Sequence, residues 1–342
     1  MLSSLLAIVV PTFGIVAVGW FCGRRGIFNR DAIHGLNAYA YIIALPALIF
    51  ESTFAQAVRA RLTGDDVRYL LGIVLAHLVV LGAAVLILRA ARREVRALGP
   101  MLLTFGSTAY LGIPFATFAF GARGTAYAAL GSTALVVTVL FASLLVLNRH
   151  GRVEQWEKGS ARPLLGRGRG RTGEPPMKTS IRREAPAATW HQLLELPFLW
   201  VVLLGILLPL LGVRALPEFV SRTVAILAGS AGPTALLALG AFQSDLTLAR
   251  IPWRWAIPLG IGKVILPTAV TVVILGAFGI RGLPLAVGAS LAATSLAVTA
   301  FVLSDEYRIG RELTAGALIV STLASLVVLS LVAFLWISGA FA

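Results

Sequence analysis

The sequence has little charge and a single cysteine. Charged residues make up 13% of the 342 residues and hydrophobic residues 58%, whereas about 25% charge is usual in a soluble domain. The mean hydropathy is +0.88. A soluble chain of this length could not hide so much apolar surface beneath a polar shell, and Cys22 has no second cysteine to pair with. The composition therefore excludes an ordinary cytosolic globule, a disordered protein and a disulfide-stabilised secreted domain.

The sequence also lacks the motifs that would indicate an enzyme. It contains no Walker A motif, no His-Glu-x-x-His and no Gly-x-Ser-x-Gly. Its four histidines are scattered at positions 34, 77, 150 and 191. We therefore expect no catalytic residues, no ATP hydrolysis by this chain, no metal site and no cofactor.

Long apolar blocks are the main feature of the sequence. A helix needs about 20 apolar residues to cross the hydrocarbon core, and the backbone in lipid must satisfy its own hydrogen bonds. We therefore predict an all-α membrane protein with ten transmembrane helices. The first block is too long for a signal-peptide core and lacks a basic start, so we expect it to be retained. The blocks are 1–23, 32–58, 69–88, 97–122, 124–148, 196–213, 223–244, 255–280, 282–304 and 313–342.

The basic residues between the blocks predict the orientation. With both termini outside, the inward loops hold 21 Lys and Arg residues and the outward loops hold 7. Cytoplasmic loops favour Lys and Arg, so we expect a multi-pass protein of the cell (inner) membrane with its long loop in the cytoplasm. This distribution accounts for most of the net charge of +14, and we expect no nucleic-acid partner.

The long loop, residues 149–192, divides the blocks five and five. It contains alternating Arg and Gly at 167–171 and two prolines at 175–176, a composition that cannot build a core. It reads as a mobile linker that sets topology. A second possible role for this loop is binding to anionic lipid headgroups. A third is RNA binding by the Arg-Gly run.

The two halves, 1–148 and 193–342, show a faint internal repeat. Five spans per half is an odd number, so a duplicated half must lie inverted in the membrane, as in many secondary transporters. The fold prediction is an inverted five-plus-five repeat. The matching positions are Pro11, Gly19 and Gly26 with Pro197, Gly205 and Gly212 at an offset of 186, and Pro46 with Pro233 at 187.

The fourth block, 97–122, combines a helix break with hydroxyl groups. Pro114 lacks a backbone donor and disfavours helix at the preceding residue, and Gly112 adds backbone freedom. Unwound backbone inside a membrane must be covered by protein or line a cavity, and half-helix N-termini suit an anion. We predict unwinding near Gly112–Pro114 beside a binding cavity; a proline kink with self-bonded hydroxyls is the alternative. The candidate substrate-binding residues are Ser107, Thr108, Tyr110, Gly112 and Pro114.

By repeat symmetry the ninth block, 282–304, should mirror the fourth and pass close to it. It has hydroxyls but no proline, and Ser and Thr loosen a helix less decisively than proline does. We therefore expect a milder break there. Its candidate substrate-binding residues are Thr294, Ser295 and Thr299.

Two charges and one histidine lie inside predicted spans, where ionisable groups are costly unless paired or hydrated. Lys263 is a candidate for substrate binding and ion coupling, with snorkelling or a structural carbonyl contact as the alternatives. Glu51 is an ion-coupling candidate that could instead reach the outer interface. His77 could relay protons, although a hydrogen-bonded structural histidine is the more ordinary role.

Several short segments, in order along nearly the whole chain, match a known family. They resemble the auxin efflux carrier family, which includes bacterial malonate-type carriers and plant auxin exporters. The segments are Pro11-Thr12-Phe13-Gly14, Ala44-Leu45-Pro46-Ala47-Leu48-Ile49-Phe50, Leu111-Gly112-Ile113-Pro114, Phe120-Gly121, Gly262-Lys263 with Pro267, Ala297-Val298-Thr299-Ala300-Phe301 with Glu306-Tyr307, and Ser321-Thr322-Leu323-Ala324-Ser325.

The resemblance implies a fold and a function. It implies a scaffold domain from spans 1, 2, 6 and 7, a transport domain from spans 3–5 and 8–10, and broken fourth and ninth helices that cross at the site. It also implies a secondary transporter of a small organic anion, with a carboxylate as the expected substrate. Ser295 stands where the family usually has a proline, and asparagines common near Ser107 and Thr299 are missing.

Three questions stay open at this stage. The carrier could couple to protons or sodium, and a sodium symporter similar to bile-acid carriers is the runner-up. A membrane sensor without transport is the alternative from a different class. The partners expected are a small organic anion and membrane lipid, and a homodimer is left open.

Overall fold

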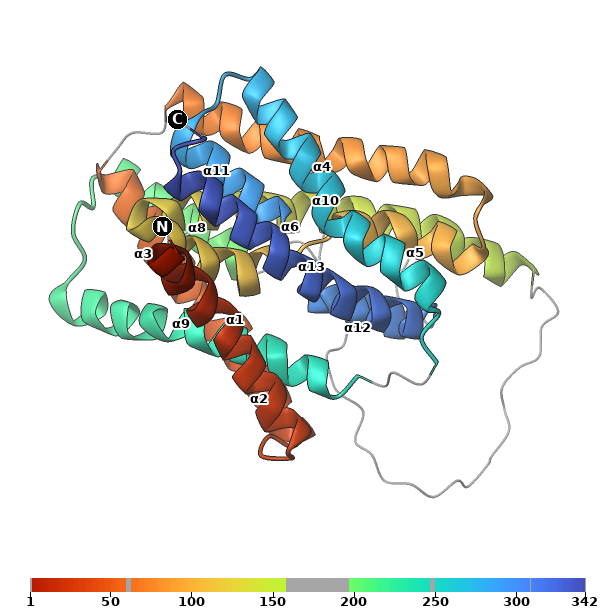
Figure 1. Cartoon of the computed structure of the whole chain (residues 1–342). Helices are drawn as coiled ribbons and strands as arrows, with labels where there is room; N and C mark the ends of the chain where they lie inside the picture. The colour runs from red at the N-terminus through yellow and green to blue at the C-terminus, as the bar shows by residue number, and fades with distance from the viewer. Residues whose placement is uncertain (1, 60–62, 158–196, 247–249, 308, 342) are drawn as a thin grey trace.

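The computed structural model describes residues 2–59, 63–157, 197–246, 250–307 and 309–341. Within these ranges the regular structure is helical, and the strand-like pairing is one isolated antiparallel bridge. Figure 1 shows the helices gathered into a bundle. The predicted linker, 149–192, lies outside the described residues from 158 onward, whereas its first nine residues, 149–157, continue a helix and are not loop.

The first half of the chain forms the following elements: α1 (Leu2–Arg24), α2 (Arg30–Tyr39), the π-helical η1 (Ala40–Ala44), α3 (Leu45–Arg59), α4 (Gly64–Ile87), the 3₁₀ turn η2 (Leu88–Ala90), α5 (Arg93–Thr104), the π-helical η3 (Thr108–Gly112) and α6 (Ile113–Glu157). The second half forms α8 (Pro197–Leu210), α9 (Glu218–Ser244), α10 (Trp253–Ala277), α11 (Gly282–Ala292), α12 (Val298–Glu306) and α13 (Arg311–Ile337).

Seven helical segments among the described residues are long and apolar enough to cross a membrane, so the chain is a multi-pass membrane protein. The sequence predicts ten transmembrane helices. The ninth block is divided into two short helices, α11 and α12, and α6 joins part of the fourth block to the fifth through a kink at Gly121. The described part of the sixth block is a short apolar helix. The count of ten and the inverted repeat therefore stay a prediction.

Two glycines that the sequence pairs at an offset of 186 end their helices in the same way. Gly26 and Gly212 both have positive φ, 72° and 94°, a conformation that glycine adopts without the Cβ penalty. After each glycine, the next amide reaches back five residues, from Ile27 to Cys22 and from Val213 to Leu208. The local geometry thus agrees with the paired positions.

Glycines on α1 and α9 let these two helices pack closely. These two helices lie side by side (Figure 1). A Cβ added at Gly19 would collide with the carbonyl of Leu237, and one added at Gly240 would collide with the carbonyl of Val16. Small residues let membrane helices approach closely, which strengthens dispersion contacts where no hydrophobic force joins helices in lipid.

A second glycine contact has the exchanged arrangement. Gly205 of α8 lies against Thr53 of α3, leaving no room for a Cβ. The first predicted span therefore packs on the seventh, and the sixth packs on the second. These two contacts pair helices of one half with helices of the other in exchanged order.

A different group of helices surrounds the centre of the bundle. Helix α10 packs against α4, α5, α11 and α13, and α6 packs against α4, α5 and α11. This arrangement brings the interrupted fourth and ninth blocks together beside α10. The division into a scaffold and a transport domain is a statement about motion and stays a prediction.

Candidate functional site at two interrupted helices

Two helices stop and restart inside the bundle. Helix α5 ends at Thr104, and three residues, 105–107, separate it from η3 and α6; we call these the first interruption. Helix α11 ends at Ala292, and residues 293–297, the second interruption, separate it from α12. The side chain of Thr104 donates to the carbonyl of Pro100 at 2.8 Å, a back-bond of the kind that bends helices near their ends.

The two interruptions hydrogen-bond to each other. The amide of Ser107 donates to the carbonyl of Ser295 at 2.7 Å, and the amide of Ala297 donates to the carbonyl of Phe105 at 3.0 Å. These bonds flank the antiparallel bridge between Gly106 and Leu296. Unpaired backbone groups in a membrane cost several kcal/mol each, so the two breaks stabilise each other. The predicted closeness of the two blocks is observed here.

The position of the first break differs from the prediction. Residues near Gly112–Pro114 do not unwind: they run from η3 directly into α6. The amide of Ile113 bonds to the carbonyl of Thr108, five residues back. The wider π-helical turn accommodates Pro114, which has no amide to give. The chain instead breaks at Gly106, where the absence of a Cβ lets the second interruption approach.

The expectation of a milder ninth break was wrong. The second interruption spans five non-helical residues and the first spans three. Side chains of other helices supply the lost hydrogen bonds: the hydroxyl of Ser321 accepts from the amide of Leu296 at 2.9 Å, and Lys263 bonds the carbonyls beside it. A proline is therefore not needed to keep α11 and α12 apart.

Lys263 is completely buried beside both interruptions. Its Nζ donates to the carbonyl of Ala292 at 3.2 Å and to that of Thr294 at 3.0 Å. Among the described residues no carboxylate forms an ion pair with it. The side chain does not snorkel to the interface. It makes the carbonyl contact that the sequence left as an alternative, at the negative end of the α11 dipole.

Gly106 provides the room for this contact. A Cβ at Gly106 would lie 2.6 Å from Oγ1 of Thr294 and 3.1 Å from Nζ of Lys263. The ammonium thus lies close to Gly106 of the first interruption while it bonds the carbonyl of Ala292, the last residue of α11, and that of Thr294 in the second interruption. The bonds that join the two interruptions are the backbone pairs described above.

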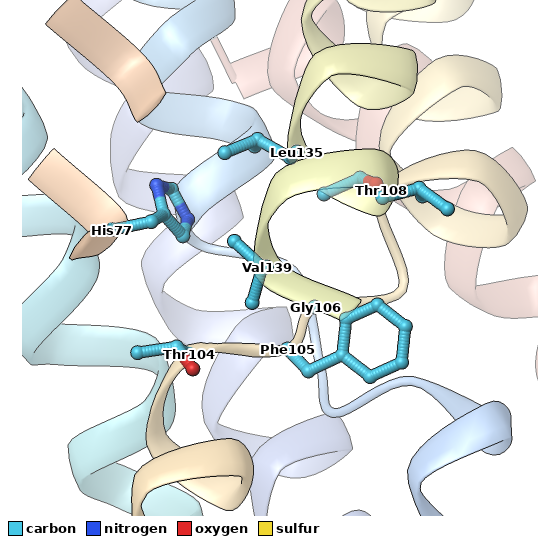
Figure 2. Close-up of a pocket in the computed structure, with 8 residues that line it drawn as sticks. His77, Thr104, Phe105, Gly106, Thr108, Leu135 and Val139 are labelled. Atoms are coloured by element: carbon cyan, nitrogen blue, oxygen red, sulfur yellow. The ribbon is translucent and has the colours of Figure 1, made fainter. Parts of the chain in front are cut away.

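A small pocket adjoins the first interruption (Figure 2). The Nδ1 atom of His77 lies 2.9 Å from the carbonyl of Ile73, and its Nε2 has no partner among the described residues. The hydroxyl of Thr108 lies 2.9 Å from that of Ser132. The pocket has no space for a water molecule. Its lining residues are His77, Thr104, Phe105, Gly106, Thr108, Leu135, Val136 and Val139.

Not all the predicted site residues meet here. Ser107, Thr294, Ser295 and Lys263 lie together at the interruptions, and the Ser295 hydroxyl is buried with no partner among the described residues. Gly112 and Pro114 are buried one to two turns further along.

Three other candidates lie elsewhere. The hydroxyl of Tyr110 donates to the carbonyl of Asn37 on α2 at 3.3 Å. Thr299 is exposed. Glu51 is half-buried on α3, a helix that packs mainly against α8 and α9. No hydrogen bond among the described residues joins the side chains of Tyr110, Thr299 or Glu51 to the two interruptions.

Sequence reasoning gave no role to three residues that build the site. Gly106, Ser132 and Ser321 contact the interruptions or the pocket beside them. Ser321 lies in a segment that matches the family, so a signal for it was present. Ser132 is found only through its contact with Thr108.

An open cavity of about 480 Å³ lies between the end of α9 and the beginning of α13. The guanidinium of Arg311 lies over the ring of Phe301, 5.3 Å from its centroid, and Phe301 packs edge-on against Phe242. Phe301 is one turn beyond the second interruption. The lining residues are Phe242, Asp245, Leu246, Arg250, Phe301, Arg311, Glu312 and Ala315.

The comparisons with known proteins agree with this architecture. The family described as "Membrane transport protein" matches residues 4–333. The chain therefore belongs to this family of membrane carriers, the auxin efflux carrier family that its segments resemble. A protein of Rhizobium meliloti (strain 1021) with the name "Putative malonate transporter" is 24% identical over 343 residues, which cover 99% of this chain and 98% of that protein.

Proposed function

We propose that the protein is a secondary carrier that moves a small organic anion, a carboxylate of the malonate type, by alternating access. The observation that carries the proposal is the pair of interrupted helices joined at the centre of the bundle. Broken helices at the middle of a membrane are where secondary transporters bind substrate. The name of the Rhizobium meliloti relative supports malonate as the first substrate to test.

The charge at the interruptions favours an anion. Helix α12 and the η3–α6 segment both begin there, and a helix N-terminus carries a partial positive charge. Lys263 neutralises the negative end of α11. The described residues place no carboxylate on this lysine. The two N-termini and Lys263 therefore outweigh the partial negative charges at the ends of α5 and α11.

The site needs one further element, a group free to bind the anion. The buried hydroxyl of Ser295 is such a group, because it donates to nothing among the described residues. Leaving a polar group unpaired in the interior costs about 1–3 kcal/mol. We propose that this hydroxyl binds the substrate carboxylate between the two interruptions, together with Ser107 and Thr294. The open cavity at Arg250 and Arg311 is the proposed route by which the anion leaves or enters.

The orientation follows from the charge distribution in the loops. We propose that both termini face outward from the inner membrane, with the long loop in the cytoplasm, because of the excess of basic residues in the inward loops. The open cavity, which is lined by two arginines and by Asp245 and Glu312, then lies at the cytoplasmic end.

The binding role of Ser295 can be separated from a structural role. Ser295→Ala removes an unpaired buried hydroxyl, so we expect unchanged or higher thermal stability without ligand. We also expect the stabilisation that malonate gives to the wild type to fall sharply. At a malonate concentration 100 times Kd, the wild-type gain is about 2.7 kcal/mol. The measurement is the melting temperature of the purified protein with malonate and with the neutral analogue malonamide.

Ser143→Ala is the matched control, because Ser143 is also a buried serine whose hydroxyl has no partner among the described residues. Its response to malonate should equal that of the wild type. The proposal is wrong if malonate stabilises the wild type no more than malonamide does. The role of Ser295 is wrong if both variants respond to malonate alike.

A further inference from the structure

The break after α11 creates a site for a positive charge. The last four carbonyls of a helix have no partner within it, and together they carry about half a negative charge. In α11 the carbonyl of Leu291 accepts from the hydroxyl of Thr294 at 2.7 Å. The carbonyls of Ala292 and Thr294 instead point to the ammonium of Lys263. The helix end and its continuation thus offer carbonyl oxygens to one shared cation.

Carbonyl oxygens arranged in this way are also the ligands that small metal cations take in proteins and channels. A lysine ammonium differs from such an ion mainly in being attached to the chain. It is a compact point charge with three donors. The stem of Lys263 comes from α10, and its Nζ reaches the carbonyls without any exposure to solvent.

The geometry leaves little space for a second cation. The ammonium bonds the last carbonyl of α11 and one carbonyl of the second interruption, and it lies against Gly106 of the first, where a Cβ would come within 3.1 Å of Nζ. The Thr294 hydroxyl, which could serve a metal ion as a further oxygen ligand, lies on the same side of Gly106. Lys263 therefore supplies the charge and occupies the two carbonyls and the space beside Gly106.

We propose that Lys263 is a tethered cation, which fills a carbonyl site that would otherwise bind a free monovalent metal ion, so that the carrier moves its anion without sodium. The transport part of this inference rests on the proposed function. The binding part does not, because it concerns a cation site that can be measured by stability alone.

Two variants of Lys263 give a direct test. Lys263→Ala removes the charge and the aliphatic stem, so the carbonyls of Ala292 and Thr294 face an empty space. Lys263→Met removes the charge but fills that space with a side chain of similar length. The measurements are melting temperature and malonate uptake into proteoliposomes, with sodium chloride or N-methylglucamine chloride on both sides. Methylammonium chloride is a third condition, since it restores the missing ammonium itself.

We expect wild-type melting and uptake to be the same in sodium and in N-methylglucamine. In N-methylglucamine, malonate uptake by Lys263→Ala should be about tenfold or more below that of the wild type, because the carbonyls of Ala292 and Thr294 are left unpaired. Sodium or methylammonium should raise the melting temperature of this variant, as a ligand of the folded state does. Either cation should also raise its uptake about fivefold above the value in N-methylglucamine. Lys263→Met should respond to neither cation.

The inference is overturned if wild-type uptake requires sodium. It is also overturned if sodium and methylammonium leave the melting temperature of Lys263→Ala unchanged, or raise that of Lys263→Met equally. Absence of malonate uptake by the wild type in every salt would instead contradict the proposed function, while the melting temperatures would still decide the cation site.

Discussion

Replacing Lys263 with methionine is expected to give a protein that folds in the membrane and loses most of its transport, about tenfold or more. Methionine retains the apolar stem within α10, so no large cavity forms. It removes the donor to the carbonyls of Ala292 and Thr294, and each carbonyl left unpaired costs about 1–3 kcal/mol. Those bonds hold the end of α11 and the start of the second interruption, which pairs with the first through its backbone. The measurement is uptake of labelled malonate in vesicles, normalised to the amount of folded protein.

Two further variants sharpen this result. Lys263→Arg should rescue transport poorly, because a planar guanidinium does not fit where a compact ammonium lies against Gly106. Thr271→Val is the control on the same helix, since the Thr271 hydroxyl is buried and contacts no partner among the described residues. It should transport at the wild-type rate. Wild-type uptake by Lys263→Met would show that the lysine has no role in transport.

Replacing Gly240 with valine is expected to abolish most of the folded protein. The added Cβ would collide with the backbone carbonyl of Val16 on α1, and backbone cannot move aside as the end of a flexible side chain can. Helices α1 and α9 would have to separate along their length and lose close packing that helix association in membranes depends on. The measurement is the yield of monodisperse protein after detergent extraction.

Gly229→Val is the matched control for this effect. Gly229 lies on the same helix, α9, but a Cβ there would meet nothing within 4 Å. Valine at this position should leave the yield and the melting temperature close to those of the wild type. Equal yields from the two valine variants would show that the close contact between α1 and α9 does not determine folding.

Hydropathy predicted most of the helices because a membrane imposes a length and an apolar surface on each span. The same rule placed a boundary between the fourth and fifth blocks at Arg123, and the chain leaves helical geometry two residues earlier, at Gly121. Hydropathy could not predict that the ninth block is divided into helices of 11 and 9 residues. That division depends on contacts with neighbouring helices.

The candidate site was predicted unevenly. Lys263 stood out because it is a charge within an apolar block, and it lies at the interruptions. The helix-breaking effect of Pro114 identified the correct block for the first break but not the correct residues. The π-helical turn before Pro114 lets the helix continue although proline has no backbone N–H to donate. Thr299 and Tyr110 were chosen by sequence proximity, yet one is exposed and the other bonds to α2.

The missed contacts share one cause. Ser321 bonds the amide of Leu296, 25 residues away in the chain, and Ser132 bonds Thr108 across 24 residues. A single sequence gives no measure of such distances. Serine in a membrane helix usually bonds to its own helix, as Ser330 does here. Ser321 also donates to Leu318 of its own helix, so its additional bond to Leu296 is visible only in the folded chain.

The most direct test of the central claim is flux in a purified system. Protein reconstituted into liposomes loaded with unlabelled malonate should accumulate labelled malonate from outside by exchange, and malonamide inside should not support this. A carrier that alternates between two faces predicts such counterflow without ATP. Labelled malonate that enters no faster than it enters protein-free liposomes, when the same preparation is folded by its melting curve, would contradict the assignment of this chain as an anion carrier.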